Sequence, residues 1–152
     1  MPDAPEIREA TAGDADVAGR MLFDFNVEFG DDGTSAEAFA ARLRALIPAG
    51  EAVVLLAGEP PAGIAVLRSR PALWADGLDA YLEELYVRPD RRGRGIGRAL
   101  LDAACERARE RGAIYIALAT GTQDTAARRL YESAGFTNLD AGEPLLYYER
   151  DL

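Results

Sequence analysis

The sequence predicts a single mixed α/β domain, and three observations support that prediction. The chain has 152 residues, 49% of them apolar, which is enough for one domain with its own core. Segments with the apolar pattern of strands alternate with segments of helical period. No repeat or linker separates them. We therefore expect one domain over residues 1–152, with its elements in the order β-α-α-β-β-β-α-β-α-β-β.

The N-terminal part of the chain is expected to form an edge strand and two helices. Glu6–Ala10 has the pattern of a short strand, and Thr11–Asp14 has the residues of a turn that begins a helix. Apolar residues then recur at helical spacing from Val17 to Phe29. A second apolar stripe follows in Ala36–Ile47, with Ser35 as the residue that caps its first turn.

The middle of the chain is expected to contain three strands. Ala52–Ala57 and Gly63–Arg68 are apolar runs joined by a short turn rich in glycine and proline, which is typical of a hairpin. Ser69–Asp79 has no strand pattern and is expected to be a loop. Tyr81–Val87 is the third strand, and it leads into a stretch rich in glycine and arginine.

Helices and strands alternate in the C-terminal part of the sequence. Arg98–Arg111 has helical periodicity and is followed by a glycine, a common helix terminator. Ala113–Ala119 is so apolar that we expect a central strand buried on both faces, parallel to the strand before the glycine-rich stretch. Asp124–Ala134 is a further helix. Two strands are expected to close the chain, one starting at Phe136 and one over Leu145–Glu149.

The composition argues against several partners and compartments. A formal net charge of −9 opposes bulk attraction to nucleic acid or to an anionic membrane. No apolar run approaches the roughly 18 residues that span a bilayer, and the first residues lack the basic and apolar regions of a secretory signal. The single cysteine, Cys105, suits a reducing compartment. We expect a cytoplasmic protein that binds neither nucleic acid nor membrane.

The sequence contains no histidine and no lysine. Their absence removes histidine-based acid–base and nucleophilic chemistry, Schiff bases and the usual zinc ligand sets. Any catalysis then has to rely on carboxylates, tyrosine, backbone amides or a bound co-substrate, and no metal is expected.

The stretch Arg88–Arg98 has the features of an anion-binding turn. Gly93, Gly95 and Gly97 alternate along it, so the backbone can turn tightly and come close to a ligand. The first amides of the following helix have no carbonyl partner four residues back and favour an anion. Five arginines and a single acid, Asp90, lie in the same stretch. We therefore expect a phosphate-bearing cofactor here.

Two spaced motifs resemble those of the GNAT superfamily of N-acetyltransferases. Arg92–Gly97 reads Arg-Gly-Arg-Gly-Ile-Gly and matches the acetyl-CoA signature Gln/Arg-x-x-Gly-x-Gly/Ala. Leu130–Phe136 reads Leu-Tyr-Glu-Ser-Ala-Gly-Phe and matches the end of the family's late helix, at the usual spacing. The resemblance implies an N-acetyltransferase fold, in which a mostly antiparallel, twisted sheet is flanked by helices and splays between its fourth and fifth strands.

The resemblance implies acetyl-CoA as co-substrate. Backbone groups at the end of the strand before the turn would bind the pantetheine arm like an extra strand, and amides of the turn would hold the pyrophosphate. Asp124 stands where the family often has Asn; it can cap its helix but cannot donate an amide N–H. The cofactor-binding residues expected in this way are Leu85, Tyr86, Val87, Arg92, Gly93, Arg94, Gly95, Ile96, Gly97, Arg98, Asp124, Ala127 and Tyr131.

The resemblance also implies direct transfer of the acetyl group to a primary amine, without a covalent enzyme intermediate. Tyr131 matches the family's general acid, because a tyrosine is protonated at neutral pH and can donate to a departing thiolate. Its alternative role is to pack the helix against the sheet. Glu83 is the first candidate for the base that deprotonates the amine, and Glu84 is the second. Strand alternation puts only one of them on a given face unless a bulge intervenes.

The acceptor would be a small molecule or a peptide. Phe25, Glu28 and Trp74 are the residues expected to bind it, because aromatic and acidic groups together suit a cationic amine. The alternative is that the aromatic residues only fill and cover the core. A free sheet edge in this fold often supports a homodimer.

Two other functions fit parts of the pattern. A dinucleotide-binding oxidoreductase would share the glycine turn, but the region Ala117–Gly121 lacks the acid that would hold the ribose. A non-catalytic acyl-CoA-binding regulatory module would keep the arginine/glycine turn, but it would need neither Tyr131 nor a carboxylate. Turnover with an amine distinguishes this module from an enzyme.

Overall fold

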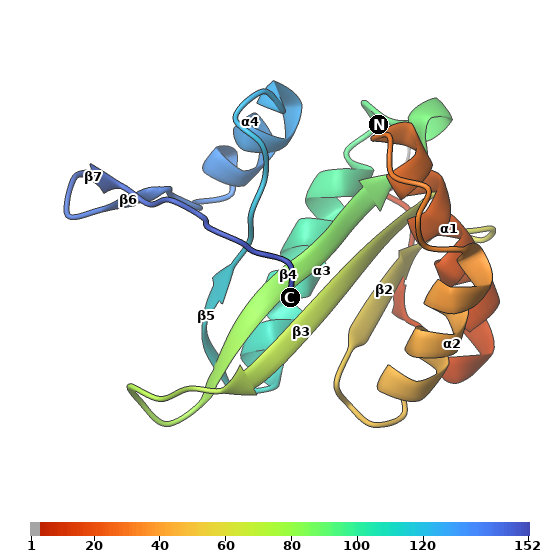
Figure 1. Cartoon of the computed structure of the whole chain (residues 1–152), viewed down its shortest axis with the longest axis horizontal. Helices are drawn as coiled ribbons and strands as arrows, with labels where there is room; N and C mark the ends of the chain where they lie inside the picture. Colours follow the sequence, from red (N-terminus) through yellow and green to blue (C-terminus); the bar gives the residue numbers. More distant parts are fainter. Residues whose placement is uncertain (1–3) are drawn as a thin grey trace. The chain divides into compact units, whose positions relative to one another are not determined.

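Five strands form one sheet in the order β1-β2-β3-β4-β5 (Figure 1). The computed structural model describes residues 4–152, and the chain divides into two compact units, Met1–Leu118 and Ala119–Leu152. Neighbouring strands are antiparallel except for β4 and β5, which are parallel. The strands of the first unit are β1 (Ile7–Glu9), β2 (Val53–Ala57), β3 (Gly63–Pro71), β4 (Leu78–Val87) and β5 (Ala113–Ala117).

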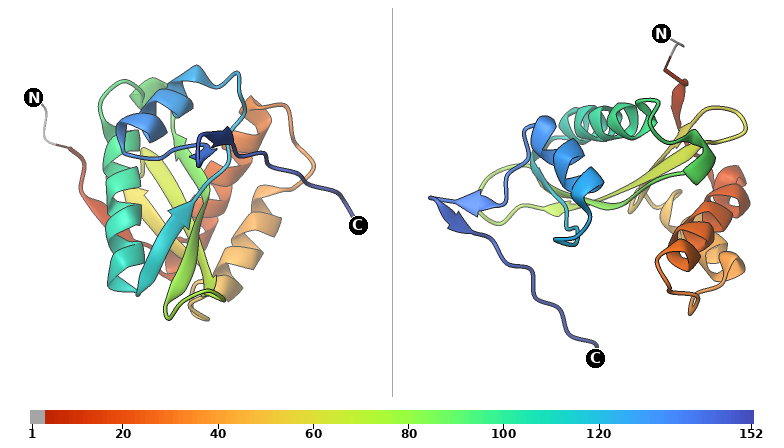
Figure 2. Two further views of the ribbon diagram at one scale, coloured as in Figure 1. Left: turned by 90° about the vertical axis from the view of Figure 1, so that its left-hand side faces the viewer. Right: turned by 90° about the horizontal axis from the view of Figure 1, so that it is seen from above.

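Helices cover both faces of this sheet (Figure 2). One face is covered by α3, whose buried Leu100 and Leu101 pack toward the strands. The opposite face is covered by α1 and α2, which share a core with residues of β2, β3 and β4. This mixed α/β arrangement is the fold class expected from the sequence. The helices are η1 (Ala12–Asp14), α1 (Ala15–Glu28), α2 (Ala36–Leu46), η2 (Pro89–Arg91) and α3 (Ile96–Glu110).

The two N-terminal helices pack closely because of local sequence features. A Cβ at Gly19 would lie 2.7 Å from the carbonyl oxygen of Ala36, so a glycine is needed where α1 meets α2. The hydroxyl of Ser35 accepts a hydrogen bond from the amide of Ala38 at 3.1 Å, which confirms Ser35 as the cap of α2.

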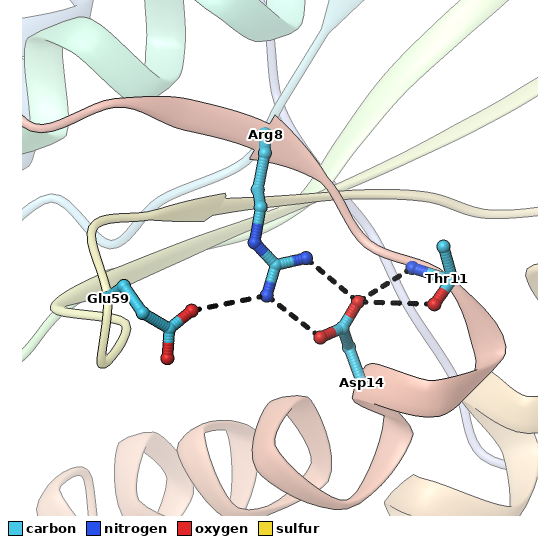
Figure 3. Close-up of polar contacts among 4 residues, drawn as sticks. All are labelled: Arg8, Thr11, Asp14 and Glu59. Carbon is cyan, nitrogen blue, oxygen red and sulfur yellow. Dashed lines mark hydrogen bonds and ion pairs between the residues drawn. The ribbon is translucent and has the colours of Figure 1, made fainter.

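A polar cluster joins β1 to the start of α1 (Figure 3). The guanidinium of Arg8 donates two hydrogen bonds to the Asp14 carboxylate at 2.9 and 2.8 Å, and the amide of Thr11 donates a third at 2.8 Å. Glu59, in the turn between β2 and β3, lies 3.6 Å from the same guanidinium. The hydrogen bonds from Arg8, and then from the Thr11 amide, lower the pKa of Asp14 to about 2.

Replacing Asp14 by asparagine is expected to destabilise the fold by about 1 kcal/mol at pH 7, because Arg8 loses its charged acceptor. The folded-state pKa of Asp14 lies below the ordinary value of 3.8. The stability that Asp14 contributes to the fold is therefore complete above about pH 4 and is lost as the pH falls toward 2. Urea unfolding at pH 7 and pH 2.5 measures this difference.

The exposed neighbour Glu59 provides the control for this experiment. Its side chain is 77% exposed, so Glu59→Gln should change the unfolding free energy little at either pH. If the unfolding free energies of wild type and Asp14→Asn differ by the same amount at both pH values, the lowered pKa assigned to Asp14 is contradicted.

Two expectations about strands in the first unit are wrong. The apolar run that begins at Ala113 is not a central strand: among residues 4–152, β5 pairs with β4 alone and forms the edge of the sheet, and Ile114 is 52% exposed. An apolar run shows strand propensity but does not supply a second neighbour. The expected loop Ser69–Asp79 is shorter, since β3 continues to Pro71 and β4 begins at Leu78.

The second unit contains α4 (Thr125–Ser133) and a small hairpin of β6 (Leu139–Asp140) and β7 (Glu143–Pro144). The expected strands at Phe136 and over Leu145–Glu149 do not form. The second of these segments is apolar but has no partner strand among the described residues, so the pattern alone does not make a ladder. None of the helices in residues 4–152 has the length and apolar character that a bilayer crossing requires.

Candidate active site

The strand β4 extends beyond the end of its parallel neighbour β5. Their pairing runs from Leu78 opposite Ala113 to Tyr81 opposite Ala117, whereas β4 continues to Val87. Beyond Tyr81, β4 is paired with β3 alone within the part of the chain that the structure describes. Because β5 itself ends at Ala117, the pairing ends there while β4 continues, and the expected splay between the fourth and fifth strands stays a prediction.

Hydrogen bonding determines which backbone groups face the open side of β4. The amide of Arg88 donates to the carbonyl of Ala62 at 2.9 Å, in register with the β3–β4 ladder. The backbone N–H and C=O groups of successive residues point to opposite sides of an antiparallel strand. Those of Tyr86, two residues before Arg88, therefore also point toward β3. Those of Leu85 and Val87 point the opposite way. The open edge can therefore accept an extended chain as an additional strand.

The glycine turn that follows β4 ends in a helix N-terminus. Gly93 and Gly95 have φ values of +75° and +80°, a left-handed conformation that side chains other than glycine rarely adopt. The first hydrogen bond of α3 joins the amide of Ala99 to the carbonyl of Gly95 at 3.0 Å. The amides of Ile96 and Gly97 come before this first hydrogen bond, so no carbonyl of the helix lies four residues back to accept from them. They are therefore suited to binding an anion.

The five arginines around the turn differ in what they contact. Arg88 lies 3.4 Å from Asp90, and Arg98 lies 3.0 Å from Asp102. Arg92 is bound to the carboxylate of Glu28. Arg91 and Arg94 are exposed and have no acidic partner among the described residues. These two carry the positive charge that remains available to an anionic ligand.

The residues expected to bind the acceptor are only partly brought together. The ring of Phe25 stacks on Tyr86 with centroids 5.1 Å apart, and Glu28 reaches the turn through its ion pair with Arg92. Trp74, in contrast, is 93% exposed in the hairpin connection at the opposite end of β4. It therefore does not cover the core, and it does not lie with Phe25 and Glu28.

A bulge in β4 separates the two candidate bases. Val66 of β3 is opposite Glu84, and the next residue of β3 is opposite Leu82, so Glu83 is the additional residue. Glu84 lies on the same face as Val66 and Tyr86, which belong to the core shared with α1 and α2. Glu83 is 44% exposed, and its carboxylate lies 3.4 Å from the guanidinium of Arg68.

The carboxyl group of Glu84 is half-buried and has no hydrogen-bond or ion-pair partner within residues 4–152. Burial, and then the neighbouring charge of Glu83, raise the pKa of Glu84 to about 7. A group with this pKa can take up and release a proton near neutral pH, as a general base requires.

The remaining predicted residues lie on α4 in the second unit. The carboxylate of Asp124 accepts a hydrogen bond from the amide of Ala127 at 3.0 Å, so Asp124 caps this helix. Tyr131 is half-buried, and its ring centroid lies 6.1 Å from that of Phe136. Burial, and then the Asp124 charge, raise the pKa of Tyr131 above its ordinary value, so its hydroxyl stays protonated at neutral pH.

Two contacts of the site were not expected from the sequence. Arg68 pairs with Glu83, and Arg92 pairs with Glu28 from a helix far earlier in the chain. Spacing along the sequence gives no signal for either pair, because each depends on how β4 packs against other elements.

Comparison with known proteins gives the following relationships. The sequence model of the Acetyltransferase (GNAT) family matches residues 20–136. An uncharacterised N-acetyltransferase from Bacillus subtilis is 32% identical over 132 residues, which are 86% of this chain and 88% of that protein. The crystal structure of a candidate acetyltransferase from Arthrobacter sp. FB24 is 47% identical, with a TM-score of 0.91 over 100% of this chain and 99% of that one.

Some curated relatives are much longer than this chain. Mycothiol acetyltransferase from Thermobispora bispora is 46% identical over 66 residues, which are 41% of this chain and 22% of that protein. The chain spans about a quarter or less of that relative and of two further ones.

Proposed function

Because the chain belongs to the Acetyltransferase (GNAT) family, we propose that it transfers an acetyl group from acetyl-CoA directly to a primary amine of a small molecule or a peptide. The observation that carries this proposal is the open edge of β4, which is followed, after the short helix η2, by a glycine turn that ends in the N-terminus of α3. The edge suits an extended amide-containing chain, and the turn suits a diphosphate. Pantetheine and the diphosphate follow one another in the same order in coenzyme A.

The residues of this region fit the co-substrate. Leu85 and Val87 direct backbone groups to the open side of β4, where they can bind a pantetheine arm. The amides of Ile96 and Gly97 can bind the diphosphate, and Arg94 is free to add positive charge. When bound, acetyl-CoA supplies the activated acetyl group.

Two side chains are proposed to move the protons of the reaction. Glu84 takes a proton from the ammonium form of the acceptor, which leaves a neutral amine able to attack. Glu84 suits this role better than Glu83, because Glu83 is exposed and paired with Arg68. Tyr131 gives a proton to the thiolate that departs, and its raised pKa supports that role.

Calorimetry and a thiol-release assay on the full chain test this function. We expect coenzyme A to bind and pantetheine, which lacks the diphosphate, to bind at least about tenfold more weakly. We also expect acetyl-CoA to release thiol only when a small primary amine or a peptide with a free N-terminus is present. Binding without release by any amine would indicate the regulatory module, and failure to bind coenzyme A would overturn the proposal.

A further inference from the structure

Arg92 is held by several groups of the protein itself. Its Nη2 donates to both carboxylate oxygens of Glu28, at 2.9 and 2.8 Å. Its Nε donates to the carbonyl of Val87 at 2.9 Å. Its guanidinium carbon also lies 5.7 Å from the ring centroid of Tyr86. The first residue of the glycine turn therefore contacts both the last residue of α1 and the end of β4.

These contacts connect α1 with the end of β4 and the glycine turn. Glu28 ends α1, and Phe25, one turn earlier, stacks on Tyr86 at 5.1 Å. The Val87 carbonyl already accepts one hydrogen bond from Arg92, so Arg92 is tied directly to the open edge of β4. The position of the glycine turn relative to β4 and α1 thus depends on an arginine that the sequence motif would assign to the ligand.

We propose that Glu28 is a positioning residue for co-substrate binding: it holds Arg92, and Arg92 fixes the glycine turn in its anion-binding conformation. This inference rests on the proposed function and gives Glu28 a different role from the acceptor contact that its sequence position suggests. Without Glu28 the turn has to be ordered by the ligand, and that ordering reduces the affinity.

The sign of the effect makes this role testable. A carboxylate beside an anion-binding turn repels the ligand, so simple electrostatics predicts that Glu28→Gln binds coenzyme A more tightly. The positioning role predicts the opposite. We expect Glu28→Gln to weaken coenzyme A binding about fivefold to tenfold, measured by calorimetry at fixed salt, with little change in the amine KM.

A double-mutant cycle identifies the partner of Glu28. If Glu28 acts through Arg92, the variant with both Glu28→Gln and Arg92→Gln should bind coenzyme A no more weakly than Arg92→Gln alone. Arg94 provides the matched control, because it lies in the same turn without an acidic partner among the described residues. The effects of Glu28→Gln and Arg94→Gln should therefore multiply.

A lysine at position 92 provides a second variant if the glutamine variants fold poorly. Arg92→Lys keeps the charge but cannot reach both the Glu28 carboxylate and the Val87 carbonyl, so it should weaken binding to a similar extent. Unchanged or tighter binding by Glu28→Gln, an effect on the amine KM alone, or full additivity with Arg92→Gln would overturn the inference. If the wild type fails to bind coenzyme A, the proposed function fails as well, and the two failures are thus distinguishable.

Discussion

Replacing Glu84 by glutamine should lower kcat by about 100-fold or more while leaving the affinity for coenzyme A unchanged. The reason is that glutamine keeps the shape of the side chain but cannot take the proton of the acceptor. In the wild type, kcat/KM should rise as the pH increases through about 7, because the Glu84 carboxyl must lose its proton to act as a base. Steady-state kinetics from pH 5.5 to 9 measure both effects, and the variant should lack the rise.

Glu83 supplies the matched control for this prediction. It precedes Glu84 in the same bulge, is exposed and pairs with Arg68 at 3.4 Å. Glu83→Gln should therefore cost no more than a few-fold in kcat and should keep the pH dependence. If Glu83→Gln instead causes the large loss and Glu84→Gln does not, the assignment of the base is reversed.

The Glu84→Gln variant should also be more stable than the wild type at alkaline pH. The folded-state pKa of Glu84 lies above the ordinary value of 4.5, so the wild type loses stability as the pH rises from about 4.5 to above 7. Glu84→Gln removes this penalty, and we expect a gain of about 1–2 kcal/mol at pH 8 and little gain at pH 4. Urea unfolding at the two pH values measures the gain, and an equal effect at both would contradict a buried, titrating carboxyl.

Replacing Tyr131 by phenylalanine should lower kcat by about 100-fold without weakening coenzyme A binding. Phenylalanine preserves the ring beside Phe136 but removes the hydroxyl that we propose as the proton donor to the thiolate. Because the pKa of Tyr131 is raised, the wild type should keep this proton donor throughout the neutral range. Thiol release under saturating acetyl-CoA measures the loss.

Tyr148, in the same unit and 83% exposed, provides the comparison for Tyr131. Tyr148→Phe should retain the wild-type rate. A Tyr131→Phe variant with an unchanged rate and altered thermal stability would instead show that Tyr131 only packs α4.

The conformation of the glycine turn could be predicted from the sequence because its requirements are local. Gly93 and Gly95 supply positive φ angles, and the helix begins at Ile96, two residues before the expected start at Arg98. The caps Ser35 and Asp124 follow from short-range hydrogen bonds to amides a few residues ahead.

The features that could not be predicted depend on contacts between distant parts of the chain. The edge position of β5 depends on which strands find neighbours, not on the apolar pattern that begins at Ala113. The bulge that gives Glu83 and Glu84 different surroundings arises from the register between β3 and β4. The ion pair between Glu28 and Arg92 requires α1 and the turn to be folded together.

Backbone amide NMR on the nitrogen-15-labelled chain tests most directly whether the open edge of β4 and the glycine turn bind coenzyme A. On titration with coenzyme A, the largest chemical-shift changes should occur at Val87 and at the amides of Gly93–Gly97. Saturating coenzyme A that leaves these amides unchanged would contradict the account, whatever other residues respond.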